Sequence, residues 1–296
     1  MPGTTPRTNI DKVDGVIPTS EEILAKSERA VRVASVNVNG IRAAYKRNMA
    51  DWIDARDTDI VCLQEVRAPD AIVRELVGEG WHILHAEAKD KGRAGVAVLS
   101  RAEPAAVRGH IGEEYFAESG RWVEADFTMQ DGSTLCVVSA YVHSGELGTQ
   151  KQEDKYRFLE RMNVRLVELK DEKDHVLVVG DLNVVHTEKD IKNWKPNHNK
   201  RAGVMDEEIA YFDGFFGAEI GYKDVARELA GPDAQGPYTW WSFRGQAFDN
   251  DAGWRIDYHM ATADLTAKAI KSHVDRASAY DLRFSDHAPL VVDYQF

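Results

Sequence analysis

Long hydrophobic runs are missing from this chain of 296 residues. No stretch approaches the roughly 18 consecutive apolar residues that a membrane-spanning helix requires. The first segment, Met1 to Lys12, also lacks the charged and then apolar pattern of a secretory signal peptide. We therefore expect a cytoplasmic protein that does not act at a membrane.

Cysteine is scarce as well. The chain has 2 cysteines, Cys62 and Cys136, and each lies within an apolar, strand-like run. Cysteines in such runs behave as small hydrophobic residues of the core. A disulfide framework and a cysteine-based zinc site are therefore excluded as organising features.

Positive charge is in deficit, with 37 Lys and Arg against 49 Asp and Glu and a net charge of −12. Such a balance argues against a protein that coats nucleic acid through bulk positive charge. It leaves open a nucleic-acid enzyme with a local basic face and a divalent cation.

The stretch that organises the chain begins at Val176, where four aliphatic residues run directly into Gly180. An apolar run of this kind is typical of a strand buried on both faces. Gly180 would allow a tight turn as the chain leaves the sheet. Asp181 and Asn183 would then project together, because side chains two apart in a strand share a face. The alternative is a strand end followed by an Asx turn of structural importance only.

Several other predicted strands end on polar residues of related type. These residues are Asn37, Asn39, Glu65, Tyr141 and the sequence Ser285-Asp286-His287 before the last strand, and Asp257 adds an acid flanked by apolar positions. A single buried acid is more often capped or salt-bridged than catalytic, but several carboxylates in one cleft are costly unless a cation neutralises them. Carboxylate and amide oxygens with one imidazole suit Mg²⁺ or Mn²⁺ better than zinc.

Strands and helices alternate after about residue 30, with hairpins among them. We expect a flexible extension over residues 1–29, with a short helix from about Ser20, and one catalytic domain over residues 30–296. The predicted helices cover residues 42–56, 69–78, 151–170, 206–216 and 222–229. The predicted strands cover residues 31–39, 59–65, 81–86, 95–100, 121–129, 134–142, 176–179, 238–243, 253–261 and 287–294. This order indicates an α/β sandwich of two mixed sheets with helices outside.

Eight short motifs give the chain a specific resemblance. They are Asn37 to Ala43, Cys62 to Glu65, Gly95 to Ala97 with Leu99 to Arg101, Ala140 to Val142, Gly180 to Asn183 with His186 and Asp190, Tyr238 to Trp241, Trp254 to Tyr258, and Ser285 to Leu290. In this order, over residues 31–296, they resemble the exodeoxyribonuclease III / AP endonuclease family of the DNase I-like endonuclease–exonuclease–phosphatase superfamily.

The resemblance implies a four-layered α/β sandwich and a Mg²⁺-dependent phosphodiesterase of DNA repair, with Mn²⁺ as a substitute metal. Its partner would be double-stranded DNA with abasic sites, blocked 3′ groups or recessed 3′ ends. The protein would act as a monomer and associate with the nucleoid. The balance between exonuclease and AP endonuclease activity stays open.

The resemblance also implies roles for individual residues. Glu65 would be the principal metal ligand with Asn39 beside it, and Asp286 would lie close to the metal. Asp181 would orient or deprotonate the attacking water, and Asn183 would hold a phosphate oxygen. His287, tuned by Asp257, would contact the phosphate. Asp181, Asn183 and His287 are further candidate metal ligands, Tyr141 would touch the scissile phosphate or the leaving oxygen, and Asp181 and His287 could exchange roles.

DNA contacts are expected from two tryptophans and two loops. Trp240 and Trp254 match positions that line a pocket for an extruded base-less sugar, although core packing would also explain them. Lys89 to Arg93 and Lys189 to Arg201 could neutralise phosphates, or could be ordinary solvated loops. The residues proposed to contact DNA are Asn37, Arg93, Asn197, Lys200, Arg201, Trp240 and Trp254.

The chain differs from the family in two segments, and two other functions are compatible with its sequence. The segment Gly145 to Gly148 lacks the basic character found there in some relatives, and Lys200-Arg201 replace an Asn-rich end of the loop. A superfamily enzyme acting on a phospholipid or inositol phosphate is the main alternative. A non-catalytic DNA-binding protein is a third, but the intact acidic and histidine set argues against it.

Overall fold

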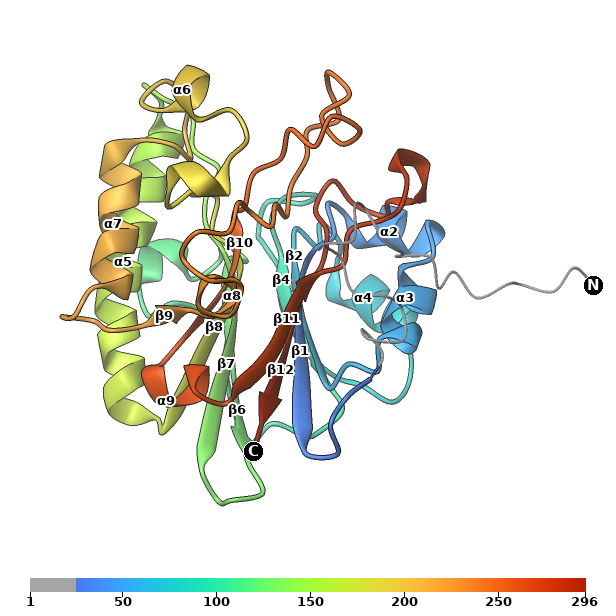
Figure 1. Cartoon of the computed structure of the whole chain (residues 1–296). Coiled ribbons are helices and arrows are strands. Elements are labelled where there is room, and N and C mark those ends of the chain that lie inside the picture. The colour runs from blue at the N-terminus through green and yellow to red at the C-terminus, as the bar shows by residue number, and fades with distance from the viewer. Residues whose placement is uncertain (1–24) are drawn as a thin grey trace, which may run out of the picture.

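The computed structural model describes residues 25–296, which form two six-stranded mixed sheets packed face to face (Figure 1). One sheet has the order β11 (Ala269–Val274), β12 (Leu290–Gln295), β1 (Ala30–Asn37), β2 (Ile60–Gln64), β4 (Val96–Ser100) and β3 (His82–Ala86). The other has the order β5 (Ala106–Arg108), β6 (Trp122–Thr128), β7 (Thr134–Tyr141), β8 (His175–Asp181), β10 (Asp257–Ala261) and β9 (Lys223–Asp224). The predicted extension lies outside these residues up to position 24, as does the start of the predicted helix at Ser20.

The hydrophobic core is divided among the layers by strand alternation. On β8, Leu177 and Val179 point between the two sheets, whereas Val176 and Val178 point to the helical layer behind it. All four side chains are fully buried. The apolar run is therefore a strand covered on both faces, as the sequence predicts.

Helices cover the outer face of each sheet. The long helix α5 (Gln150–Glu172) and α7 (Asp206–Phe216) pack on the sheet that contains β8. The helices α2 (Ile41–Lys46), α3 (Met49–Ala55) and α4 (Asp70–Val77) pack on the sheet that contains β1. The predicted four-layered sandwich is thus confirmed (Figure 1).

Shorter elements line the connections. They are α6 (Trp194–Asn197), α8 (Val225–Ala230), α9 (Ala263–Thr266) and three 3₁₀ turns at Glu114–Phe116, Glu188–Asp190 and Tyr280–Leu282. Within residues 25–296, no helix has both the length and the apolar character that crossing a membrane would require.

Strand register brings the polar strand ends to one edge of the sandwich. The parallel pair β7–β8 places Tyr141 beside Asp181, and the antiparallel pair β8–β10 places Asp257 opposite Asp181. In the other sheet, the parallel pair β1–β2 places Asn37 beside Gln64, directly before Glu65. Parallel strands end at the same edge, so these residues meet where the two sheets face each other.

Several predicted elements differ from the structure. The helix expected over residues 42–56 is broken between α2 and α3 at Asn48, whose φ is 67°. The strand expected from His287 begins at Leu290, because Pro289 has no N–H for the ladder. Residues 238–243 form no strand, and Trp240 makes isolated bridges to Trp254 and His287 instead. The helix expected from residue 222 begins after β9.

Buried neutral histidines make the fold sensitive to acid. Burial lowers the pKa of His259 from 6.5 to about 3, and the pKa values of His273 and His143 fall similarly. The unfolded chain therefore binds more protons than the folded protein below pH 6.5. The contribution of these histidines to stability is complete above that pH and declines towards pH 3. Between pH 7.5 and 5 we expect each buried histidine to cost about 2 kcal/mol of unfolding free energy.

The test is urea unfolding of His259→Asn at both pH values. Whatever its stability at pH 7.5, this variant should lose about 2 kcal/mol less than the parent protein on acidification. The matched control is His82→Asn, because the His82 side chain is exposed. Equal losses in the parent and in His259→Asn would contradict the assignment.

Candidate active site

The same local turn follows β1 and β8, one strand from each sheet. The backbone N–H of Asn39 donates to Asn37 Oδ1 at 3.0 Å, and that of Asn183 donates to Asp181 Oδ1 at 3.0 Å. Asn39 and Asn183 have left-handed φ values of 44° and 51°, which asparagine tolerates. The expected proximity of Asp181 and Asn183 is therefore real, but an Asx turn creates it rather than strand alternation.

Gly180 has a different role from the predicted turn. It lies inside β8, and a Cβ atom there would come within 1.8 Å of the Ala140 carbonyl oxygen on β7. The glycine is required because the neighbouring strand approaches its backbone closely. It thereby fixes how Tyr141 and Asp181 stand beside each other.

Asp181, His287 and Asp257 form a buried acid–imidazole–acid group. His287 Nδ1 lies 2.8 Å from Asp257 Oδ2, and His287 Nε2 lies 3.7 Å from Asp181 Oδ2. Asp257 itself is almost fully buried, at 1% exposure, behind the histidine. Asp257 therefore orients the ring and leaves Nε2 directed at Asp181, as expected for a carboxylate that sets the protonation state of a histidine.

The two central groups have displaced pKa values. Burial raises the pKa of Asp181, and the Asp257 and Glu65 carboxylates add to this rise against the opposing effect of His287. Burial alone would lower the pKa of His287, but the carboxylates of Asp257 and Asp181 outweigh it and raise that pKa. Perturbed pairs of this kind are characteristic of acid–base chemistry.

Glu65 is the centre of a second group. Its Oε1 accepts hydrogen bonds from Tyr141 Oη at 2.7 Å and from Asn37 Nδ2 at 3.2 Å. Its Oε2 is paired with the Arg67 guanidinium. Burial, followed by the Glu65 charge, raises the pKa of Tyr141, so this phenol stays protonated and donates.

Hydrogen bonds between the sheets connect the two groups. Asn37 Nδ2, from β1, also donates to Asp181 Oδ2 on β8 at 2.8 Å. Asn39 Nδ2 donates to Asp286 Oδ1 at 2.9 Å, and Trp240 Nε1 donates to Asp286 Oδ2 at 3.0 Å. Each carboxylate is thus held by donors from more than one chain segment, which gives a preorganised site.

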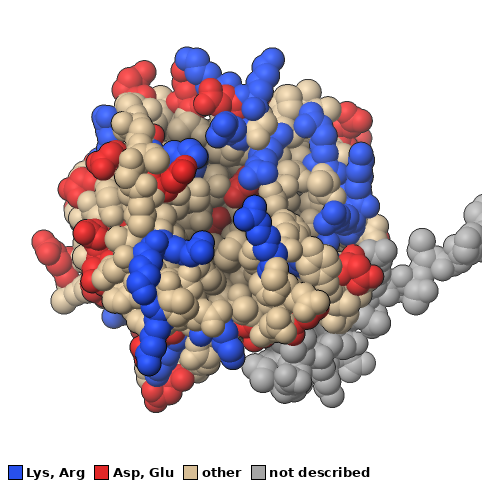
Figure 2. Space-filling model, turned by 90° about the horizontal axis from the view of Figure 1, so that it is seen from above, with Lys and Arg blue, Asp and Glu red and all other residues tan. Residues whose placement is uncertain are grey.

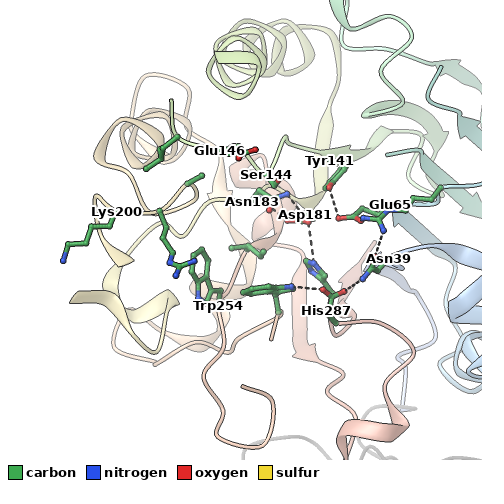
Figure 3. A pocket seen from close by; sticks show the side chains of 18 residues that line it. Asn39, Glu65, Tyr141, Ser144, Glu146, Asp181, Asn183, Lys200, Trp254 and His287 are labelled. Carbon is green, nitrogen blue, oxygen red and sulfur yellow. Dashed lines mark hydrogen bonds and ion pairs between the residues drawn. The ribbon is translucent and has the colours of Figure 1, made fainter. Parts of the chain in front are cut away.

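Most of these side chains line a pocket of about 610 Å³ (Figure 3). Seen from above, the same face is hollowed, with acidic atoms inside the hollow and Lys and Arg side chains around it (Figure 2). The predicted residues that line the pocket are Asn39, Glu65, Tyr141, Asp181, Asn183, Lys200, Arg201, Trp240, Trp254, Asp286 and His287. A locally basic rim therefore coexists with the acidic net charge.

Three predicted DNA contacts lie elsewhere. Asn37 is fully buried, so direct contact with DNA is wrong for this residue, and it orients Glu65 and Asp181 instead. Asn197 is outside the pocket and donates to the Asn193 carbonyl at 2.6 Å within α6. Arg93 lines a separate, smaller cavity.

Sequence reasoning missed some of the pocket wall. Arg67, Ser144, Glu146, Leu147, Ala202 and Ile256 also line it. Arg67 could have been suspected, since it follows the predicted ligand Glu65 by two residues. Glu146 and Leu147 belong to the segment Gly145 to Gly148, which lacks basic residues. No pattern in the sequence indicates that this segment lies beside the pocket.

A buried ion pair fixes the loops behind this wall. Lys155 Nζ, on α5, lies 2.7 Å from Glu208 Oε1 and donates to the Asn183 carbonyl at 2.8 Å. Glu208 Oε2 accepts from the backbone N–H groups of Gly203 and Met205. Burial, opposed by Glu208, lowers the pKa of Lys155. The pair joins the turn at Asn183 to the segment that follows Lys200 and Arg201.

We expect Lys155→Met to destabilise the protein by about 3–5 kcal/mol, because it leaves the Glu208 charge buried and unpaired. Any activity that uses the Asn183 turn should fall with it, because the turn loses its anchor. Urea unfolding and turnover measure the two effects. For the unfolding measurement Lys151→Met is the matched control, since its exposed pair with Glu146 should be worth no more than about 1 kcal/mol. Equal effects of the two substitutions would refute the anchoring role.

The donor chemistry of the pocket fits a hard divalent cation. Glu65, Asn39 and Asp286 offer carboxylate and amide oxygens at the pocket surface, the ligand type that Mg²⁺ prefers. Asp181, Asp257 and His287 also offer ligand atoms within 4.8 Å of one another. His287 Nδ1 is already committed to Asp257, however, so the oxygen set around Glu65 is the better site for a hard cation.

Comparison with known proteins identifies the family. Residues 34–287 match the endonuclease/exonuclease/phosphatase family. The chain belongs to this family. It is 35% identical over 262 residues to an exodeoxyribonuclease of Bacillus subtilis, covering 88% of this chain and 98% of that protein. It is 34% identical over 278 residues to the DNA repair nuclease APEX1 of Danio rerio, covering 92% and 85% of the two chains.

A solved structure agrees with this assignment. The AP endonuclease of Archaeoglobus fulgidus superposes with a TM-score of 0.76 and 25% identity, over 90% of this chain and 100% of that one. The predicted resemblance to the exodeoxyribonuclease III / AP endonuclease family is thereby confirmed.

Proposed function

We propose that this protein is a Mg²⁺-dependent phosphodiesterase of DNA repair. It would cleave 5′ to abasic sites and remove nucleotides or blocking groups from 3′ ends of double-stranded DNA. The observation that supports this most directly is the pairing of the Asp181–His287–Asp257 group with the Glu65–Asn39–Asp286 oxygen set in one pocket. Hydrolysis of a phosphodiester needs both an activated water and stabilised charge on the phosphoryl oxygens.

Asp181 is the proposed general base. Its raised pKa makes it a stronger base than an ordinary carboxylate, and its Oδ2 is held by Asn37 towards the pocket. His287 is the proposed electrostatic contact to the phosphate, because its raised pKa favours the protonated ring. A protonated ring cannot accept a proton from water, and this supports giving the role of base to Asp181.

The remaining polar groups would hold the phosphate and the leaving oxygen. Asn183 Nδ2 donates to Asp181 Oδ2 at 3.2 Å and lines the pocket, where it can turn to a phosphoryl oxygen. The Tyr141 hydroxyl lies on the Glu65 side and can donate to the leaving oxygen. A cation bound at Glu65, Asn39 and Asp286 would neutralise the charge that develops on the phosphate.

The tryptophans form the part of the pocket proposed for the base-less sugar. The rings of Trp240 and Trp254 meet edge to face with centroids 5.6 Å apart, and Ile256 lies beside them. Both side chains are partly exposed to the pocket, whereas the adjacent Trp241 is buried in the core. An apolar wall of this kind accepts a deoxyribose without its base better than a complete nucleotide.

We expect Trp254→Ala to reduce kcat/KM on a duplex with an abasic site by about 10- to 150-fold, because removal of the indole forfeits about 1.5–3 kcal/mol of apolar contact with the sugar. Removal of nucleotides from an undamaged recessed 3′ end should change less. Trp81→Ala is the control, because Trp81 stacks with Arg101 outside the pocket. An equal loss on both substrates would show that Trp254 supports the fold rather than lesion recognition.

The decisive experiment compares three duplexes in the presence of Mg²⁺ and of EDTA. One carries a single abasic-site analogue, one has a recessed 3′ end, and one is blunt and undamaged. A metal-dependent nick 5′ to the lesion supports AP endonuclease activity, and shortening from the 3′ end supports exonuclease activity. No product from any duplex would overturn the proposal and direct attention to phospholipid and inositol phosphate substrates.

The active unit is proposed to be a monomer that works where the cell keeps its DNA, in the cytoplasm at the nucleoid. The support is that one chain supplies every residue of the pocket described above.

A further inference from the structure

Arg67 occupies the oxygens that a metal ion would need. Its Nη1 donates to Asn39 Oδ1 at 2.7 Å, and its Nη2 pairs with Glu65 Oε2. These two oxygens belong to the set that best fits a hard cation. In the metal-free protein, the guanidinium therefore supplies the positive charge that the Glu65 carboxylate requires.

The Arg67 backbone is fixed, but its side chain is not enclosed. Arg67 N donates to the Ala94 carbonyl at 2.9 Å, and Val66 N donates to the Gly95 carbonyl at 3.0 Å. The Arg67 side chain is 40% exposed. A rearrangement at this position can therefore be confined to the side chain and needs no movement of the sheet.

A second cavity lies on the other side of Arg67. It measures about 230 Å³, and its lining includes Arg42, Lys91 and Arg93, with Arg67 shared between it and the active-site pocket. Among residues 25–296, the charged groups of Arg42, Lys91 and Arg93 have no ion-pair or hydrogen-bond partner. The one acid in the lining, Glu87, accepts a hydrogen bond from the backbone N–H of Asp70. Three unpaired cations around one cavity favour an anion.

We propose that Arg67 is a shared cation that couples metal binding to DNA binding. Without metal it neutralises Glu65 and holds Asn39. When a divalent cation takes these oxygens, repulsion between like charges releases the guanidinium, which then joins Arg42, Lys91 and Arg93 in binding a backbone phosphate in the second cavity. The DNA half of this inference rests on the proposed function, whereas the metal half stands on the chain's own residues.

This arrangement has three consequences. Metal and DNA each strengthen the binding of the other by the same factor, because coupling between two sites is reciprocal. Removal of the guanidinium tightens metal binding by the protein alone and abolishes the coupling. Substitution of Arg42 or Arg93 weakens DNA binding but leaves metal binding by the protein alone unchanged.

The metal half is tested without DNA and without activity, by Mn²⁺ titration followed by electron paramagnetic resonance. Arg67→Met should bind Mn²⁺ about fivefold more tightly than the parent, the factor that loss of a partly exposed competing ion pair allows. Arg67→Lys keeps the charge but cannot bridge both oxygens, so its affinity for Mn²⁺ should lie between those of the parent and of Arg67→Met. Arg101→Met is the control, since Arg101 follows β4 at the end of the sheet opposite Glu65. Unchanged or weaker Mn²⁺ binding by Arg67→Met would overturn the proposal.

The DNA half is tested by fluorescence anisotropy with an abasic-analogue duplex, with and without Mn²⁺, in an Asp181→Asn background. Mn²⁺ should raise DNA affinity by about fivefold or more in this background and by less than about twofold when Arg67→Met is added. If Mn²⁺ raised DNA affinity to the same extent without Arg67, the proposed role of Arg67 in coupling would be overturned. If no variant bound DNA, the proposed function would fail, and the Mn²⁺ titration would still decide whether Arg67 competes with the metal.

Discussion

Replacing Asp181 by Asn should reduce kcat on an abasic duplex by about a thousandfold, within the range found when a general base is removed. The substitution is nearly isosteric, and its amide oxygen can still accept from the Asn183 backbone N–H that Asp181 Oδ1 holds at 3.0 Å. What is lost is the carboxylate that would take the proton from water. Single-turnover cleavage measures the loss, and anisotropy should show DNA binding that is unchanged or tighter, because a negative charge has left the phosphate site.

The matched control for this prediction is Asp171→Asn. Asp171 is an exposed acid near the end of α5 and does not line the pocket. The substitution Asp171→Asn removes the same charge from the protein and leaves the site unchanged. Turnover of Asp181→Asn within about tenfold of the parent would contradict the role of Asp181 as base and would favour His287 for it.

Removal of the divalent metal should abolish cleavage completely, and Glu65→Gln should move the Mg²⁺ requirement upward. Glu65 is the carboxylate that both Tyr141 and Asn37 hold in place. Loss of its charge should raise the Mg²⁺ concentration for half-maximal activity by more than about tenfold, since even the hydrogen-bond partners of metal ligands are worth 10- to 100-fold in affinity. Cleavage in EDTA and a Mg²⁺ titration of each variant provide the measurement.

Two comparisons make the metal prediction decisive. Glu79→Gln removes an exposed carboxylate outside the pocket and should leave the Mg²⁺ requirement unchanged. If Glu65→Gln also leaves it unchanged while His287→Asn abolishes Mn²⁺ binding, the cation binds at the Asp181–Asp257–His287 group instead. Cleavage that persists in EDTA would refute a metal-dependent reaction altogether.

The core layers and the location of the site were predictable because both depend on periodicity. The run that begins at Val176 is apolar at every position, and such a strand must be covered on both faces. Polar residues directly after such strands have to leave the core at the edge, and the packing of the two sheets then brings Glu65 and Asp181 to the same Asn37 amide. Trp240 and Trp254 were placed at the pocket by the family resemblance and not by any pattern in the chain.

The functions of individual side chains were less predictable where the backbone leaves regular geometry. Asn37 is the last residue of β1 and was expected to contact DNA, yet it points inward between the sheets. Asn39, Glu65, Arg67 and Asn183 all have positive φ values, so strand alternation says nothing about their directions. Nothing in the sequence distinguishes Lys155 from the other lysines of its helix, yet it is buried against Glu208 from another helix.

The amino-acid sequence by itself determined the two buried sheets, their helical covers and the set of acids, amides and histidine that meets at one edge. Spacing along the chain specifies these features, because hydrophobic burial depends on which positions are apolar. Tertiary structure alone decided that Asn37 supports the carboxylates, that Lys155 anchors the Asn183 turn, and that Arg67 stands between two cavities. These outcomes depend on which distant segments meet, and no local pattern in the chain records that.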